Sequence, residues 1–200
     1  MKYYRSDRER AALTHARKLA SVDIGRAREE IRALVARESF VSAFEFAMML
    51  WFGDGCGEDR IEAKEWLRLA ADNEIASAQF FYGMIMYHDG QLREFSIYLW
   101  RAVELGYPPA AYSLGVILLN GTNGRFKDYE VGRSLLEKAQ RLGHFWAEFA
   151  IGWYEMKGYF GVSAKLSGCV KMLRSTGHVC RIALLAPANY PMKPGVGSWV

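Results

Sequence analysis

A short pattern returns four times along the chain and constrains the fold more than any other feature. A small residue lies between large apolar or aromatic neighbours in every copy; these residues are Ala47, Gly83, Gly115 and Gly152. Successive copies are separated by 36, 32 and 37 residues. Repeats of this length are typical of stacked helix pairs, in which each pair buries its apolar face against the next. The sequence therefore predicts an all-α fold and favours binding over catalysis.

Each copy is interpreted as two helices joined by a polar turn that contains glycine. The small residue lets two helix backbones approach, and a large residue on the second helix fills the neighbouring space. We place the large residues at Trp66, Tyr98 and Leu135, with Cys169 in the fourth copy. The pairs are predicted over about residues 42–77, 78–109, 110–146 and 147–177. The fourth pair is expected to be the least regular, because Cys169 stands where the other copies have a large residue.

Further residues recur with the repeat and point to a family. In the copy from Ser42 they are Gly53, Gly55, Asp59, Ala63, Trp66, Ala70, Ala71 and Ala78; in the copy from Ala110 they are Leu114, Gly115, Gly121, residues 127–130, Ala139, Gly143 and His144. This pattern resembles the Sel-one-like repeat (SLR) family, relatives of the tetratricopeptide repeats, over about residues 42–181. The resemblance implies a right-handed α-α superhelix, a solenoid of antiparallel helix pairs. It also implies a bacterial adaptor that works by protein–protein interaction.

The flanks are predicted to cap this array. Residues 1–41 are expected to form a degenerate repeat of two charged helices: Ser6 and Glu9 make a capping-box pattern for the first, and the second runs over about 24–37. A solenoid needs such a polar end. Residues 178–186 are predicted as a last helix, followed by an extended tail with three prolines.

The resemblance also implies where a partner binds. By analogy with the tetratricopeptide repeats, the concave surface is lined by residues one, four and five places after the small residue. The predicted partner-binding residues are Trp51, Phe52, Met84, Tyr87, His88, Leu119, Asn120, Trp153, Met156 and Lys157. This aromatic strip suits an apolar peptide, a partner helix or the protein's own tail. The alternative is that these residues pack between repeats, which we favour for Met48 and Val116.

Motifs for chemistry are few, and we predict neither an enzyme nor a cofactor. The three cysteines, Cys56, Cys169 and Cys180, lack the spacing of a metal site, and no His-x-x-x-His pair occurs. The glycine-rich stretch 53–57 is interpreted as a repeat turn rather than a phosphate loop, because no lysine of the required kind follows it. An uncharacterised enzyme that uses His88 stays an alternative. Another alternative is a dedicated inhibitor or immunity protein that neutralises one toxin or enzyme.

The charge distribution limits the partner classes. Residues 1–40 carry ten Lys/Arg and six Asp/Glu, which accounts for the net charge of +4. The two signs are interleaved there, as in a solvated cap, so we expect a protein or peptide partner and no nucleic acid. No apolar run of about 18 residues and no N-terminal signal is visible, so we expect no membrane span and a cytoplasmic location. We expect a monomer or a weak homodimer.

Overall fold

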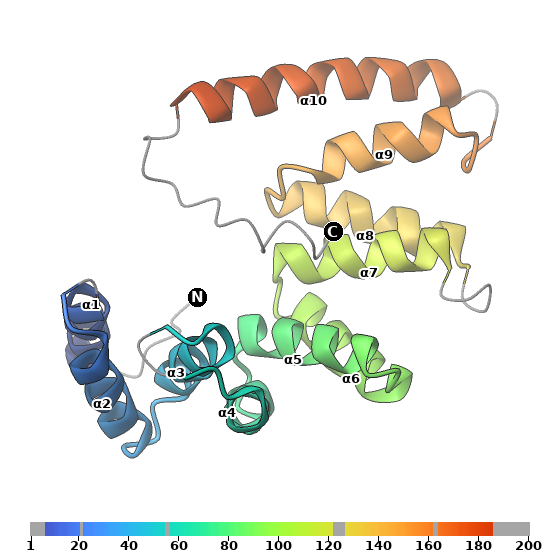
Figure 1. The fold of residues 1–200 in the computed structure, drawn as a ribbon. Coiled ribbons are helices and arrows are strands. Elements are labelled where there is room, and N and C mark those ends of the chain that lie inside the picture. The colour runs from blue at the N-terminus through green and yellow to red at the C-terminus, as the bar shows by residue number, and fades with distance from the viewer. Residues whose placement is uncertain (1–6, 21, 55–56, 122–126, 162–163, 186–200) are drawn as a thin grey trace. The chain divides into compact units, whose positions relative to one another are not determined.

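The computed structural model describes residues 7–20, 22–54, 57–121, 127–161 and 164–185, and these residues form ten helices and no strand (Figure 1). The all-α prediction is confirmed. In chain order the helices are α1 (Asp7–Ala20), α2 (Ile24–Val35), α3 (Phe40–Phe52), α4 (Arg60–Asp72), α5 (Ala76–His88), α6 (Leu92–Glu104), α7 (Pro108–Asn120), α8 (Tyr129–Arg141), α9 (Ala147–Met156) and α10 (Lys165–Leu185).

The helix ends follow from local sequence signals. Asp59 caps α4 by accepting hydrogen bonds from the backbone N–H groups of Ile61 and Glu62, and Asp128 caps α8 by accepting one from Val131. Gly53 ends α3 in the left-handed conformation, with φ of 67°. A proline begins α7, where its missing N–H is not needed. These signals fix where each helix starts and stops.

The turn that follows each second helix up to α8, which we call the closing turn, has a residue with positive φ in every case. Glu38, Glu74, Gly106 and Gly143 all have positive φ, between 61° and 87°, and they follow α2, α4, α6 and α8. Their intervals of 36, 32 and 37 residues equal those of the small residues. The second helix of the N-terminal pair, α2, is thus followed by the same positive-φ turn as the second helices of the repeats.

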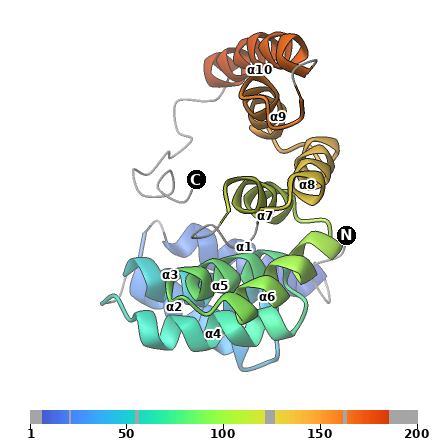
Figure 2. The same ribbon diagram turned by 90° about the vertical axis from the view of Figure 1, so that its right-hand side faces the viewer.

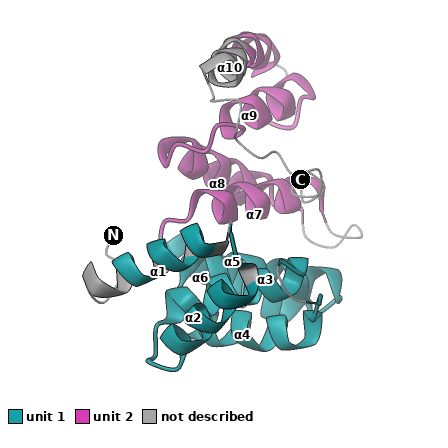
Figure 3. Cartoon of the chain, turned by 60° about the vertical axis from the view of Figure 1, so that its left-hand side comes forward, with its two compact units in different colours: residues 1–105 teal, residues 106–200 magenta. Residues whose placement is uncertain are grey.

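The chain forms two compact units, residues 1–105 and 106–200 (Figure 3). Unit 1 contains the helix pairs α1/α2, α3/α4 and α5/α6, and unit 2 contains α7/α8 and α9/α10. Within each pair the helices lie side by side (Figures 1 and 2). The first helices of the repeats, such as α5, are apolar over most of their surface, whereas second helices such as α8 are amphipathic. The first helices therefore supply most of the core.

Unit 2 is built on two crossings at which glycine faces glycine. A Cβ atom added to Gly115 in α7 would lie 3.0 Å from the carbonyl oxygen of Gly132 in α8. A Cβ added to Gly168 in α10 would lie 2.5 Å from the carbonyl oxygen of Gly152 in α9. Real side chains do not show a distance of 2.5 Å to a backbone atom, so the α9/α10 crossing requires glycine, while the contact at Gly115 would be tight and would force α7 or α8 to shift slightly. In unit 1 the equivalent Gly83 meets side chains of α6 instead, Leu99 first.

The Gly168 crossing corrects the predicted register of the last helix. Gly115 lies against Leu136, and Gly152 lies against Met172, so residues of α10 correspond to residues of α8 that are 36 positions earlier. Lys171, rather than Cys169, therefore occupies the place of Leu135, and Cys169 is exposed.

The predicted helix end at Gly177 is also absent, since α10 continues to Leu185. In the corrected register the turn residue Gly143 corresponds to Val179. A β-branched residue does not readily adopt positive φ, so the turn that closes the earlier repeats cannot form there and the helix continues. The predicted separate helix over 178–186 is thus the second part of α10 up to Leu185, and the tail beyond it lies outside the described residues.

Candidate functional site

An aromatic residue precedes each small residue by three positions, a regularity that the sequence analysis missed. These residues are Phe44, Phe80, Tyr112 and Phe149. All four are half-buried. On a helix, this position and the one that follows the small residue are four apart and lie on one face. The second position holds Met48, Met84, Val116 and Trp153. The two positions together define the face of each first helix that carries the candidate site.

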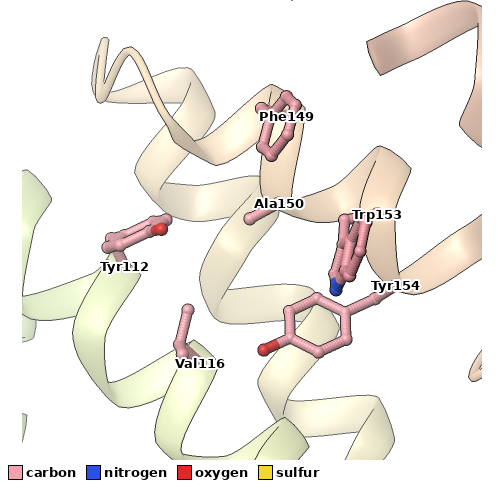
Figure 4. A pocket seen from close by; sticks show the side chains of 6 residues that line it. All are labelled: Tyr112, Val116, Phe149, Ala150, Trp153 and Tyr154. Carbon is pink, nitrogen blue, oxygen red and sulfur yellow. The ribbon is translucent and has the colours of Figure 1, made fainter. Parts of the chain in front are cut away.

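In unit 2 this face encloses a pocket, which we call the α7/α9 pocket. Its volume is about 350 Å³, and it is lined by Tyr112, Val116, Phe149, Ala150, Trp153 and Tyr154. Figure 4 shows Tyr112 and Val116 approaching from α7 and the other four side chains from α9. A pocket that is mostly apolar with a few polar atoms is typical of a binding site. Val116, for which we favour packing, packs against the buried core cluster of unit 2 and also lines the pocket.

The polar side-chain atoms of this pocket are the hydroxyls of Tyr112 and Tyr154 and the indole N–H of Trp153. The Tyr154 hydroxyl donates a hydrogen bond to Oδ1 of Asn120 at 3.1 Å. Burial raises the pKa of Tyr112 and also that of Tyr154, so both phenols are neutral at pH 7. They offer hydroxyl groups to a ligand but no charge. The site therefore selects by shape and apolar contact, with hydroxyl groups at its edge.

Trp153 supplies the exposed part of the pocket wall. The residue is 40% exposed, and Nζ of Lys157 lies 4.9 Å from the centre of its ring. This cation–π contact joins Trp153 to the residue that caps the C-terminal end of α9. A large ring that stays exposed in the folded chain is the kind of residue that anchors partners at protein interfaces.

His144 supports the pocket from behind Tyr112. Its ring stacks on the Tyr112 ring with the centroids 4.3 Å apart and the planes 18° from parallel. The Phe145 ring stacks on the His144 ring, with the centroids 5.6 Å apart. Nδ1 of His144 is buried and has no hydrogen-bond partner among the described residues. Burial lowers the pKa of His144 to about 4, so the ring is neutral at pH 7. His144 thus acts as an aromatic support in the closing turn after α8.

Two of the predicted partner-binding residues belong to the core instead. Leu119 is completely buried, and a Cβ added to Gly132 would lie 2.7 Å from its Cγ, so Leu119 fills the space that this glycine leaves. Met84 is also buried, in unit 1. Leu119 faces the second helix of its pair, since Gly132 lies in α8. Neither residue is available to a partner in this conformation.

The other predicted residues are accessible to different degrees. Phe52, His88, Asn120, Trp153 and Lys157 are exposed, while Trp51, Tyr87 and Met156 are half-buried. In unit 1 the Trp51 ring lies under the guanidinium of Arg60, 5.3 Å away, and Tyr87 packs on Phe95 at 5.0 Å. Only Trp153 of this set lines the α7/α9 pocket.

The described residues offer little for metal chemistry or membrane insertion. No group of three His, Cys, Asp or Glu side chains in this part of the chain is placed to hold a metal ion. Among the same residues, no helix has both the length and the apolar character that crossing a bilayer requires.

Comparison with known sequence families identifies the repeat. The pattern of the Sel1 repeat family matches residues 41–74, 76–94 and 108–144. The chain is a Sel1 repeat protein. The matches cover the helices α3, α4, α5, α7 and α8 and only the start of α6, and the fourth pair, α9/α10, lies outside them, in agreement with its altered register. Sel1 repeats generally mediate protein–protein interactions. A comparison with curated proteins found no match.

Solved structures share the Sel1 repeat fold. A protective antigen of uropathogenic Escherichia coli with an SLR fold is 18% identical, with a TM-score of 0.67 over 77% of this chain. A Sel1 repeat protein from Oxalobacter formigenes is 18% identical, with a TM-score of 0.70 over 83% of this chain and 69% of its own. An immunity protein from Pseudomonas aeruginosa is 21% identical, with a TM-score of 0.58 over 87% of this chain and 68% of its own. The chain spans only 33% of the E. coli antigen. At these identities the likenesses concern the fold alone.

Proposed function

We propose that this Sel1 repeat protein is an adaptor that binds a segment of a partner protein on the α7/α9 face, with one large apolar side chain of the partner in the α7/α9 pocket. The observation that carries the proposal is the pocket itself, an aromatic hollow of about 350 Å³ with Trp153 exposed at its edge. Its volume lies at the lower end of the roughly 300–1,000 Å³ typical of ligand pockets, which suits one side chain better than an extended ligand.

The proposal does not include catalysis. His88, the residue considered for a reaction, lies exposed at the end of α5, with its ring 5.7 Å from that of Tyr87. The pocket lies in unit 2, whereas α5 lies in unit 1. The tyrosines of the pocket are neutral and its other lining residues carry no ionisable group. We therefore propose a binding module of a bacterial protein, as the family resemblance implies.

The test is affinity capture from a lysate of the source organism, followed by titration of the purified partner. The bait is the wild-type chain beside a Phe149→Ser/Trp153→Ser variant. A Trp100→Ser variant is the matched control, because Trp100 in α6 is 38% exposed, close to Trp153 at 40%. The proposal expects the control to bind as the wild type does and the double variant to lose at least about 2 kcal/mol of binding free energy. Equal binding by all three chains would exclude the pocket.

A second candidate is an immunity-type inhibitor, which the likeness to the P. aeruginosa immunity protein supports over most of the chain length. The two functions differ in the partner that they need. An adaptor binds short peptides with Kd values of about 1 µM, whereas an inhibitor binds one folded enzyme or toxin with a Kd of about 1 nM or below. Titration with the intact partner and with overlapping peptides of it separates them. Nanomolar binding that no peptide reproduces would favour the inhibitor.

A further inference from the structure

The outer face of α10 carries an apolar stripe that unit 2 does not bury. Leu166, Val170 and Leu173 are 81%, 62% and 76% exposed. Their spacing of four and then three residues places them in one line along the helix, as in the seam of a coiled coil. We call these three residues the α10 stripe. Large aliphatic side chains exposed together on one helix face mark a surface that binds something.

The stripe is not required for packing inside the unit. The opposite side of α10, with Gly168 and Met172, lies against Gly152 of α9. In α8, the equivalent helix of the preceding pair, the stripe positions are occupied by Glu130, Ser134 and Glu137. Polar residues are thus compatible with this position in a second helix. The replacement of all three by aliphatic residues in α10 indicates a contact that α8 does not make.

The charge of the C-terminal part of the chain, residues 156–200, indicates which kind of partner makes that contact. Glu155 is the last acidic residue of the sequence, and residues 156–200 contain six Lys/Arg and no Asp/Glu. Residues 41–155, in contrast, contain ten Lys/Arg and sixteen Asp/Glu. In α10 itself Lys165 and Arg174 are exposed. Arg174 approaches Glu148 of α9 at 3.9 Å but its side chain is 79% exposed, so its charge faces solvent next to the stripe.

We propose that the α10 stripe binds an amphipathic helix of another protein, with its apolar residues against Leu166, Val170 and Leu173 and with Asp and Glu on its flanks. Arg174, at an e position beside the seam, then faces an acidic residue of the partner, which is the usual arrangement of charges beside such a helix pair, and Lys165 adds positive charge on the opposite flank. A second copy of α10 fits less well, since it would bring basic residues against basic residues. The proposal concerns a surface separate from the α7/α9 pocket and does not rest on it.

The experiment uses the full chain and two synthetic helical peptides of 21 residues. Both carry Leu at heptad positions a and d; one has Glu at positions e and g, and the other has Lys there. The chain variants are Leu166→Ser/Leu173→Ser and Lys165→Glu/Arg174→Glu. The matched control is Ile61→Ser/Ile97→Ser, because these isoleucines are also exposed, on α4 and α6. Thermal melting first establishes that each variant is folded.

The proposal expects the Glu peptide to bind the wild-type chain and the control at least about tenfold more tightly than the Lys peptide does. The Leu166→Ser/Leu173→Ser variant should lose about tenfold in affinity for the Glu peptide, and the charge reversal should invert the peptide preference. Because the charges are exposed, the preference should also weaken in 1 M salt. A Trp153→Ser variant should bind the Glu peptide normally.

Several outcomes would overturn the proposal. One is equal affinity for both peptides, or an unchanged affinity after the Leu166→Ser/Leu173→Ser substitution. Another is a wild-type dimer in sedimentation that this substitution dissociates, which would assign the stripe to a second copy. A third is binding to phosphatidylglycerol vesicles that the same substitution abolishes while peptide binding is absent, which would assign it to a membrane surface.

Discussion

Nζ of Lys171 in α10 lies 2.5 Å from Oε1 of Glu155 in α9, a carboxylate that is only 2% exposed. Nη2 of Arg133 in α8 lies 3.7 Å from the same oxygen, while Oε2 is buried and has no hydrogen-bond partner among the described residues. In the third repeat the corresponding places hold Leu118 and Leu135. The fourth repeat has therefore exchanged an apolar pair for an ion pair across the helix contact.

Removing one member of this pair should destabilise unit 2 more than replacing both. Lys171→Leu leaves the Glu155 carboxylate buried with only the more distant Arg133, and we expect it to lower the free energy of unfolding by about 2–3 kcal/mol. Glu155→Leu/Lys171→Leu restores the apolar pair of the third repeat and should be at least as stable as the wild type. Urea denaturation of the three chains measures both effects. A double variant as unstable as the single one would show that the ion pair itself stabilises the fold.

The glycines at the helix crossings should differ in their tolerance of a methyl group. Gly168→Ala places Cβ against the backbone of α9 and should cost about 3 kcal/mol, because a backbone cannot move aside. Gly83→Ala meets Cδ1 of Leu99 at 2.5 Å, the end of a flexible side chain, and should cost about 1–2 kcal/mol. Gly25→Ala in α2 is the control: its nearest neighbour lies at 3.5 Å, so its effect should stay within about 0.5 kcal/mol. Thermal melting gives the order, and a different order would contradict the assigned crossings.

Most of the fold could be predicted, because two helices that cross closely need a small residue at the crossing. The positions of these crossings in the sequence are given by Ala47, Gly83, Gly115 and Gly152. The register of α10 could not be predicted in the same way. Gly177 resembled a closing turn, and the decisive glycine, Gly168, could be recognised only from its contact with Gly152. The effect of Val179 on the missing turn follows only once that register is known.

The candidate site could be predicted only in part. Counting forward from the small residue found Trp153, which lines the pocket, but it also selected Leu119, which the fold buries. The recurring aromatic three places before the small residue was the better signal, since it gives Tyr112 and Phe149. Which of the repeated faces forms a pocket depends on side-chain packing between α7 and α9, and no single repeat contains that information.

Stability should fall as the pH drops from about 6.5 to about 4, because of His144. Burial lowers its folded-state pKa to about 4 from an ordinary value of 6.5, so the unfolded chain binds the proton more readily in this interval. The stabilisation is fully present above pH 6.5 and is lost as the pH falls toward the folded-state pKa. Since the ring is only partly buried, we expect an effect on the order of 1–2 kcal/mol. Chemical denaturation at a series of pH values measures it.

A His144→Phe variant is the control for that pH dependence. Phenylalanine keeps an aromatic ring against Tyr112 but cannot titrate. The other ionisable groups are the same in both chains, so their contributions cancel in the difference. The difference in unfolding free energy between the variant and the wild type should therefore grow below pH 6.5. A constant difference would mean that His144 is hydrated in the folded protein.

Filling the α7/α9 pocket should block binding without removing any of its aromatic walls. The side chain of Ala150 points into the pocket from α9, between Phe149 and Trp153 (Figure 4). Ala150→Leu adds three carbons there and should weaken binding of the captured partner at least about tenfold, because the partner's side chain no longer fits. Ala150 is nearly buried, so some overpacking is expected, with a loss of about 1 kcal/mol in stability. Ala150→Ser leaves the pocket open and should keep most of the affinity. Titration calorimetry of the two variants and the wild type separates the loss of space in the pocket from a loss of fold. Equal weakening of binding by both variants would contradict a pocket that receives a side chain.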